Sequence, residues 1–310
     1  MIRVEGLTKT YGDFKALNQV SFEINRGEIV GFLGPNGAGK STTLRILTGY
    51  ISPSSGTAWL AGQNISEMNE SYREHVGYLP EGAPLYPEMS VSRFLLFVAK
   101  IRQIPSSERC AAVDLVINQC GLESMRFRTM STLSKGYRQR VGIAQAIIHQ
   151  PDVLILDEPT SGLDPNQLDE ILSLIREYGA GRTVLFSSHI LSEVQAVCTR
   201  VLILNQGQLI ADDTPEHLAK KLSGHRYCLT IQGADTTAAL SELRTAPGVI
   251  GVSVSQVEVD SISLHLELES DIHRGEISKR VIGAGWSLIE FRTLSADLEE
   301  IFRTLTGGPE

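Results

Sequence analysis

Residues 34–41 read Gly34-Pro35-Asn36-Gly37-Ala38-Gly39-Lys40-Ser41, and they fill every fixed position of the pattern G-x-x-x-x-G-K-S. The apolar run at 28–33 predicts a buried strand before this loop, and apolar residues at helical spacing follow it. In such a context the glycines allow the backbone N–H groups to point at a chain of phosphates. The Lys40 ammonium can reach the β- and γ-phosphates, and the Ser41 hydroxyl can bind Mg²⁺. The stretch therefore predicts an α/β fold with a nucleotide-phosphate site.

Length and charge limit the classes of function. The chain has 310 residues, which indicates two domains, and its apolar fraction of 42% is ample for a packed core. Its net charge of -8 argues against nucleic acid as a partner. An acidic protein can still bind an acidic nucleotide, because the loop amides and Lys40 act at contact distance, whereas remote charges are screened over roughly 8–10 Å.

The four cysteines are scattered without a C-x-x-C pair, which is typical of reduced thiols in a cytosolic protein. The N-terminal residues 1–5 do not have the pattern of a signal peptide. No apolar run approaches the ~20 residues that a membrane span requires. We therefore expect a cytoplasmic protein whose role at any membrane depends on a partner.

A second chemical signal lies at 153–158, where four apolar residues are followed by Asp157 and Glu158. Such a run predicts a central parallel strand, and Asp157 at its end can hold Mg²⁺ while Glu158 orients or deprotonates a water molecule. A strand that simply ends in polar residues is the alternative, and the upstream phosphate loop disfavours it. His189 follows another predicted strand at 183–187 and can contact the γ-phosphate, although a lone histidine is more often structural.

Weaker signals surround these two. Tyr11 lies in a predicted polar turn, where its ring can stack on adenine or be an ordinary surface side chain. Glu81 lies at the exit of a predicted strand at 76–81. Ser134 is a good N-cap for a helix that contains Gly136, and a helix N-terminus is an anion site, but many helices begin with serine.

In this order, the motifs from Tyr11 to His189 resemble those of the nucleotide-binding subunit of ATP-binding-cassette (ABC) transporters. The resemblance implies a P-loop NTPase fold over 1–222, with an antiparallel β subdomain and a helical insertion at about 82–150. It implies that the chain binds ATP and Mg²⁺ and hydrolyses ATP.

The resemblance also implies a role for each matching position. Catalysis is assigned to Lys40, Glu158 and His189, and the metal ligands to Ser41, Asp157 and Glu81. Tyr11 is expected to stack on adenine, and Thr42 belongs to the phosphate-binding segment that begins at Gly34. Ser134 and Gly136 would contact the ATP of a second subunit, expected to be another copy of this chain, and Asp164 would communicate across that head-to-tail dimer.

Two departures from the family pattern involve three positions. The signature segment has Lys135 and Tyr137 where its common form has Gly and Gln, although Ser134 and Gly136 are kept. Glu81 stands where the family has a glutamine, which adds negative charge beside the γ-phosphate. A carboxylate is also a hard oxygen ligand, so contact with the ion can persist. Because of the added negative charge, we expect the site to depend more strongly on Mg²⁺.

Residues 225–310 form a separate predicted domain with the order βαββαβ, that of a small ferredoxin-like sandwich. This tail resembles the extension on ATPases that serve ABC-2-type export permeases, and gliding-motility-associated ATPases are similar. The resemblance implies an integral membrane permease docked near residues 85–102 and a peripheral location on the inner face of the cell membrane.

The main alternative is a soluble ABC ATPase that acts on ribosomes or DNA. It is disfavoured because the chain has one cassette, no long coiled coil between the phosphate loop and the signature segment, and an acidic balance. A metal- or redox-regulated binding module has little support from the scattered cysteines. The sequence does not identify a transported substrate.

Overall fold

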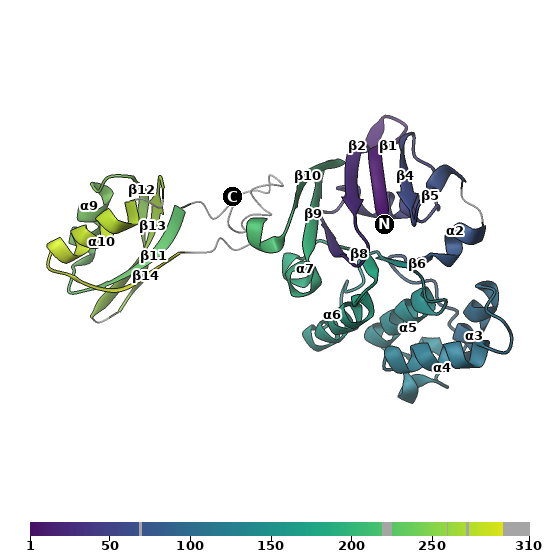
Figure 1. The fold of residues 1–310 in the computed structure, drawn as a ribbon. Coiled ribbons are helices and arrows are strands. Elements are labelled where there is room, and N and C mark those ends of the chain that lie inside the picture. Colours follow the sequence, from purple (N-terminus) through teal and green to yellow (C-terminus); the bar gives the residue numbers. More distant parts are fainter. Residues whose placement is uncertain (68–69, 219–224, 259, 271–272, 294–310) are drawn as a thin grey trace. The chain divides into compact units, whose positions relative to one another are not determined.

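The computed structural model describes residues 1–67, 70–218, 225–258, 260–270 and 273–293 (Figure 1). The chain divides into two compact units, Met1–Pro215 and Glu216–Glu310. Each unit has its own buried core, so each is described separately.

The first unit is built on a six-stranded sheet with the order β10-β9-β3-β8-β7-β6. Strands β6 to β9 and β3 run parallel, and only β10 is antiparallel to its neighbour. Every residue of the strands β3, β6, β7 and β8 is buried, which explains their continuous apolar runs. The sheet comprises β3 (Ile29–Leu33), β6 (Val76–Leu79), β7 (Val153–Leu156), β8 (Thr183–Ser188), β9 (Arg200–Asn205) and β10 (Gln208–Asp213).

A smaller antiparallel sheet, with the order β2-β1-β4-β5, lies in the same unit. Its strands are β1 (Ile2–Tyr11), β2 (Phe14–Ile24), β4 (Ser55–Leu60) and β5 (Gln63–Asn64). One apolar core contains Ile2 and Phe22 of this sheet, Phe32 of β3, and Leu44 of α1 (Lys40–Leu47). The phosphate loop therefore emerges between a rigid strand and a helix that are both fixed by the same core.

The helical insertion expected at about 82–150 contains the helices α3 and α4, which pack with α5 as one group (Figure 1). Two further helices, α6 and α7, pack on the strands β8 and β3. The helices are α2 (Glu70–Glu74), α3 (Val91–Ile101), α4 (Arg109–Gln119), α5 (Lys135–Ile147), α6 (Pro165–Gly179) and α7 (Leu191–Val197), with short 3₁₀ turns at Ile65–Glu67, Glu123–Met125 and Met130–Thr132.

The second unit has the predicted βαββαβ order. Its antiparallel sheet runs β12-β13-β11-β14, and alternate strand residues such as Leu229 and Leu264 pack against Ile277 and Val281 of a helix. The elements are β11 (His225–Gln232), α9 (Thr236–Arg244), β12 (Val249–Val257), β13 (Ser261–Leu268), α10 (Arg274–Gly283) and β14 (Ser287–Thr293). The sequence also predicts a helix at 296–305, and these positions lie outside the described residues.

Within the described ranges, no helix combines the length and apolar character that crossing a bilayer requires.

Candidate nucleotide site

The phosphate loop links β3 to α1, and two of its glycines are required by close packing. A Cβ on Gly34 would lie 2.4 Å from the carbonyl oxygen of Leu204, and one on Gly39 would lie 2.6 Å from that of Ala16. Gly39 also has a φ of 106°, a left-handed conformation that favours glycine. It precedes α1 without a side-chain cap, so the first-turn N–H groups are not occupied by the residue before them.

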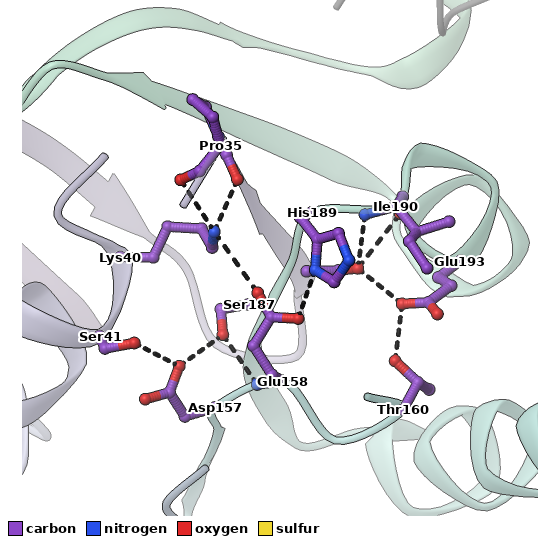
Figure 2. Close-up of polar contacts among 12 residues, drawn as sticks. Pro35, Lys40, Ser41, Asp157, Glu158, Thr160, Ser187, His189, Ile190 and Glu193 are labelled. Atoms are coloured by element: carbon purple, nitrogen blue, oxygen red, sulfur yellow. Dashed lines mark hydrogen bonds and ion pairs between the residues drawn. The ribbon is translucent and has the colours of Figure 1, made fainter. Parts of the chain in front are cut away.

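The side chain of Lys40, the first residue of α1, contacts the start of the phosphate loop. Its Nζ donates hydrogen bonds to the carbonyl oxygens of Gly34 at 2.6 Å and Pro35 at 3.3 Å. It also lies 3.4 Å from Oε1 of Glu158, and both charged side chains are buried (Figure 2). Asn36 and Gly37 are exposed at the tip of the loop, whereas Ala38 is buried. The phosphate loop is thus held by packing of its glycines against backbone carbonyl groups and by the hydrogen bonds of the Lys40 ammonium.

Asp157 follows β7 and joins the loop to the central strands. Its Oδ1 accepts hydrogen bonds from the hydroxyls of Ser41 at 3.0 Å and Ser187 at 2.7 Å. Its Oδ2 is buried and has no hydrogen-bond partner among the described residues. Burial, and after it the charge of Asp157, raise the pKa of Tyr78 in β6 to about 12. A carboxylate oxygen beside a serine hydroxyl is the donor set that a hard cation takes.

Glu158 is placed by backbone and side-chain contacts together. Its φ of 49° is left-handed, and its N–H donates to the Ser187 hydroxyl at 2.9 Å. Its Oε2 lies 2.8 Å from Nδ1 of His189, which is partly exposed at the end of β8. The carboxylate thus contacts Lys40 on one side and His189 on the other. Lys40, Ser41, Asp157, Glu158, Ser187 and His189 are called the phosphate-loop cluster below.

The sequence identified five of these six residues, and it missed Ser187. The signal for Ser187 is the polar ending of β8, where two serines follow an apolar run that is buried throughout. Because the carboxyl ends of parallel strands share one sheet edge, β8 brings its serine to the acids that follow β7.

Other predicted site residues form a second group. Ser134 caps α5 by accepting from the Tyr137 N–H at 3.4 Å, and Asp164 caps α6 by accepting from the Gln167 N–H at 2.9 Å. A Cβ on Gly136 would lie 2.5 Å from Oε1 of Gln167, so the two helix starts lie against each other. Ser134, Gly136 and Asp164 are called the signature group; none of the hydrogen bonds found in the described chain joins them to the phosphate-loop cluster.

Three predicted residues lie apart from these contacts. Tyr11 ends β1 with 47% of its surface exposed, and the Lys9 ammonium lies 5.2 Å from the centre of its ring. Glu81 is exposed, two residues beyond Leu79, which pairs with Leu156 beside the acids. Thr42 is partly buried in the first turn of α1. The roles expected of these three residues remain predictions.

The fold and this arrangement define a P-loop ATP-binding cassette. The sequence profile described as "ABC transporter" matches residues 17–161. Linearmycin resistance ATP-binding protein LnrL of Bacillus subtilis (strain 168) is 31% identical over 311 residues, which cover 99% of this chain and 98% of that protein. Bacitracin transport ATP-binding protein BcrA of Bacillus licheniformis is 33% identical over 310 residues, with coverage of 99% and 98%.

A solved structure, described as the dimeric structure of MJ0796, a bacterial ABC transporter cassette, superposes with a TM-score of 0.64. It is 25% identical, and the match covers 69% of this chain and 98% of that one. The chain belongs to the family of ABC transporter ATP-binding proteins. It is an ATP-binding and ATP-hydrolysing subunit of a transporter.

Proposed function

We propose that this chain hydrolyses ATP at the phosphate-loop cluster and that the reaction drives an ABC-2-type permease, as an exporter. The observation that carries the proposal is the position of Glu158, whose carboxylate contacts both Lys40 and His189 in a buried setting. A general base must be held within reach of the proton that it takes, and these two contacts fix the orientation of the Glu158 carboxylate.

In this proposal, ATP lies along the loop from Gly34 to Thr42. The backbone N–H groups of the loop and the N-terminus of α1 face the phosphates, and Lys40 moves from its carbonyl partners to the β- and γ-phosphates. Tyr11 stacks on the adenine. Because each of these contacts is local, the net negative charge of the chain does not oppose it.

Mg²⁺ fits the residues present. Ser41 and Asp157 offer two neighbouring oxygens, one of which is a buried carboxylate oxygen without a hydrogen-bond partner among the described residues. No group of three or more His, Cys, Asp or Glu residues in the described chain is arranged to hold a metal ion, which suits an ion that takes most of its ligands from water and phosphate. Ser41, Asp157 and Glu81 would hold the ion, and it would neutralise phosphate charge.

Glu158 then accepts a proton from the attacking water. The water oxygen bonds to the γ-phosphorus, the bond from that phosphorus to the β-phosphate oxygen breaks, and ADP leaves with the electron pair. His189 holds the carboxylate through Nδ1 and faces the γ-phosphate, so it reports whether the phosphate is present.

The signature group supports a head-to-tail dimer. Ser134 and Gly136 belong to the same chain as the phosphate-loop cluster but make no hydrogen bond with it among the described residues, so we propose that they complete the site of a second copy. The dimeric cassette structure supports this proposal. ATP would close the dimer, and hydrolysis would open it.

A groove of about 1260 Å³ in the first unit suits a permease helix. It lies between the core and the α3–α4 helices, and exposed aromatic side chains line it: Tyr50, Tyr86 and Phe97. We propose that it takes the membrane subunit on the cytoplasmic side. The match to LnrL and BcrA over both units supports a drug-export class.

The test is a pull-down of tagged Glu158→Gln from detergent-solubilised membranes with MgATP, with tagged Lys40→Ala as the control that cannot hold ATP. Recovery of a polytopic membrane protein supports the transporter assignment and identifies the permease. Recovery of ribosomes or DNA-bound complexes without a membrane protein would favour the soluble-ATPase alternative instead.

A further inference from the structure

Glu193 is a buried carboxylate that the proposed chemistry does not use. It lies on α7, four residues after His189, and only 2% of its surface is exposed. Its Oε2 accepts hydrogen bonds from the hydroxyls of Thr160 at 2.7 Å and Ser188 at 2.6 Å (Figure 2). Its Oε1 has no hydrogen-bond partner among the described residues. Burial of a carboxylate costs free energy, and the two hydrogen bonds from the hydroxyls offset part of that cost.

The two hydroxyls belong to segments that carry the proposed catalytic residues. Thr160, itself buried, comes two residues after Glu158, and Ser188 comes directly before His189. The Ser188 oxygen also accepts the Ile190 N–H at 2.9 Å, which fixes the turn on the far side of His189. One carboxylate oxygen therefore ties the loop after β7 to the last residue of β8, beside the point where Glu158 and His189 meet at 2.8 Å.

We propose that Glu193 is a positioning residue for ATP hydrolysis, which clamps the Glu158 loop to the His189 loop through Thr160 and Ser188. The proposal rests on the roles assigned above to Glu158 and His189. Glu193 touches neither residue directly and acts only through the two hydroxyls. Small displacements of a catalytic group cost up to about 10²-fold in rate, so loss of the clamp lowers kcat while ATP binding at the phosphate loop persists.

The experiment measures kcat, KM and the affinity for a fluorescent ATP analogue in the full-length chain. The variants are Glu193→Ala, which removes the acceptor, Glu193→Gln, which keeps one acceptor oxygen for the two hydroxyls, and Thr160→Val, which removes one donor. Gln195→Ala is the matched control, because this residue is exposed on the same helix. Thermal unfolding reports whether each variant is folded.

We expect kcat to fall by about ten- to a hundred-fold in Glu193→Ala and less in Thr160→Val, with analogue affinity within about two-fold of wild type. Glu193→Gln recovers most of the rate, and adding Thr160→Val to Glu193→Ala lowers it no further. Parallel loss of kcat and affinity, or wild-type turnover in Glu193→Ala, overturns the clamp. If Glu193→Ala does not fold, the test rests on Thr160→Val: a lowered kcat with unchanged analogue affinity supports the clamp, and a wild-type kcat overturns it. Wild-type hydrolysis by Glu158→Gln would instead overturn the proposed function.

Discussion

Nζ of Lys40 lies 3.4 Å from Oε1 of Glu158, and the two side chains are only 6% and 9% exposed. The ammonium of the phosphate loop is thus paired with the carboxylate that we propose as the general base. A γ-phosphate that engages Lys40 competes with Glu158 for the same charge. We therefore propose that nucleotide binding and the release of Glu158 toward water are linked through this one buried ion pair.

Replacing Lys40 by Met should abolish ATP binding and also destabilise the fold. Removing one partner leaves Glu158 buried with His189 alone and leaves the Gly34 carbonyl without its donor, so we expect a loss on the order of 3 kcal/mol. Urea unfolding and nucleotide titration measure the two effects. Lys100→Met, at an exposed position on α3, is the control, and equal stability of the two variants would contradict the importance of the pair.

Ser187→Ala should destabilise the chain without any nucleotide present. The Ser187 hydroxyl donates to Asp157 and accepts the Glu158 N–H, so its loss leaves that buried N–H without its acceptor and leaves Oδ1 of Asp157 with the Ser41 hydroxyl alone. The expected cost is about 1–3 kcal/mol of unfolding free energy. Ser192→Ala, at an exposed position on α7, should change stability little. A Ser187→Ala variant as stable as this control would show that the two hydrogen bonds contribute nothing.

His149 should make stability depend on pH. Its Nε2 lies 3.0 Å from the Val76 carbonyl oxygen, while Nδ1 is buried and has no hydrogen-bond partner among the described residues. Burial, and after it the Arg102 guanidinium, lower the pKa of His149 to about 4. Between that value and the unfolded pKa of about 6.5, the unfolded chain binds more protons, so stability rises with pH.

The stabilisation is therefore complete above pH ~6.5 and is lost as pH falls toward 4, by up to roughly 3 kcal/mol. Urea unfolding of the wild type and of His149→Gln between pH 4 and 7 measures it, because the carboxylates titrate in both proteins and cancel. The variant should show the shallower dependence. His265→Gln, at an exposed position, should follow the wild type, and parallel curves for His149→Gln and wild type would refute the assignment.

The sequence predicted the parts of the site that depend on local pattern. The strand before the phosphate loop, β3, and the strand before Asp157, β7, lie in one parallel sheet with β8 between them, so their carboxyl ends meet at one edge. The left-handed φ of Glu158 could not be predicted, because it is fixed by a hydrogen bond to Ser187, 29 residues away in the sequence. Long-range contacts of this kind have no local signal.

The burial of Glu193 was missed for the same reason. An acid on a short helix usually faces water, and only the fold shows that Thr160 and Ser188 converge on it. The predicted turn at Tyr11 was wrong, because β1 runs from Ile2 to Tyr11, with its register shifting along the pairing with β2. Propensity alone does not follow a strand through such irregularities.

Glu81→Gln should change how hydrolysis depends on Mg²⁺. Glu81 follows β6 at the sheet edge that carries Asp157, where we propose that its carboxylate binds the Mg²⁺ ion that neutralises the γ-phosphate. We expect the variant, which has lost an anionic oxygen ligand, to need a higher Mg²⁺ concentration for half-maximal hydrolysis. Glu88→Gln, exposed further along the chain, is the control. Identical Mg²⁺ titrations of Glu81→Gln and wild type would remove Glu81 from the site.

The most direct test of the site is to measure ATP binding and steady-state hydrolysis of Glu158→Gln in one preparation. The amide keeps the size of the side chain but cannot take a proton from water. We predict near wild-type ATP affinity with turnover reduced by ~10²–10⁴-fold. Wild-type turnover in this variant would contradict the assignment of Glu158 as the general base and, with it, the proposed mechanism.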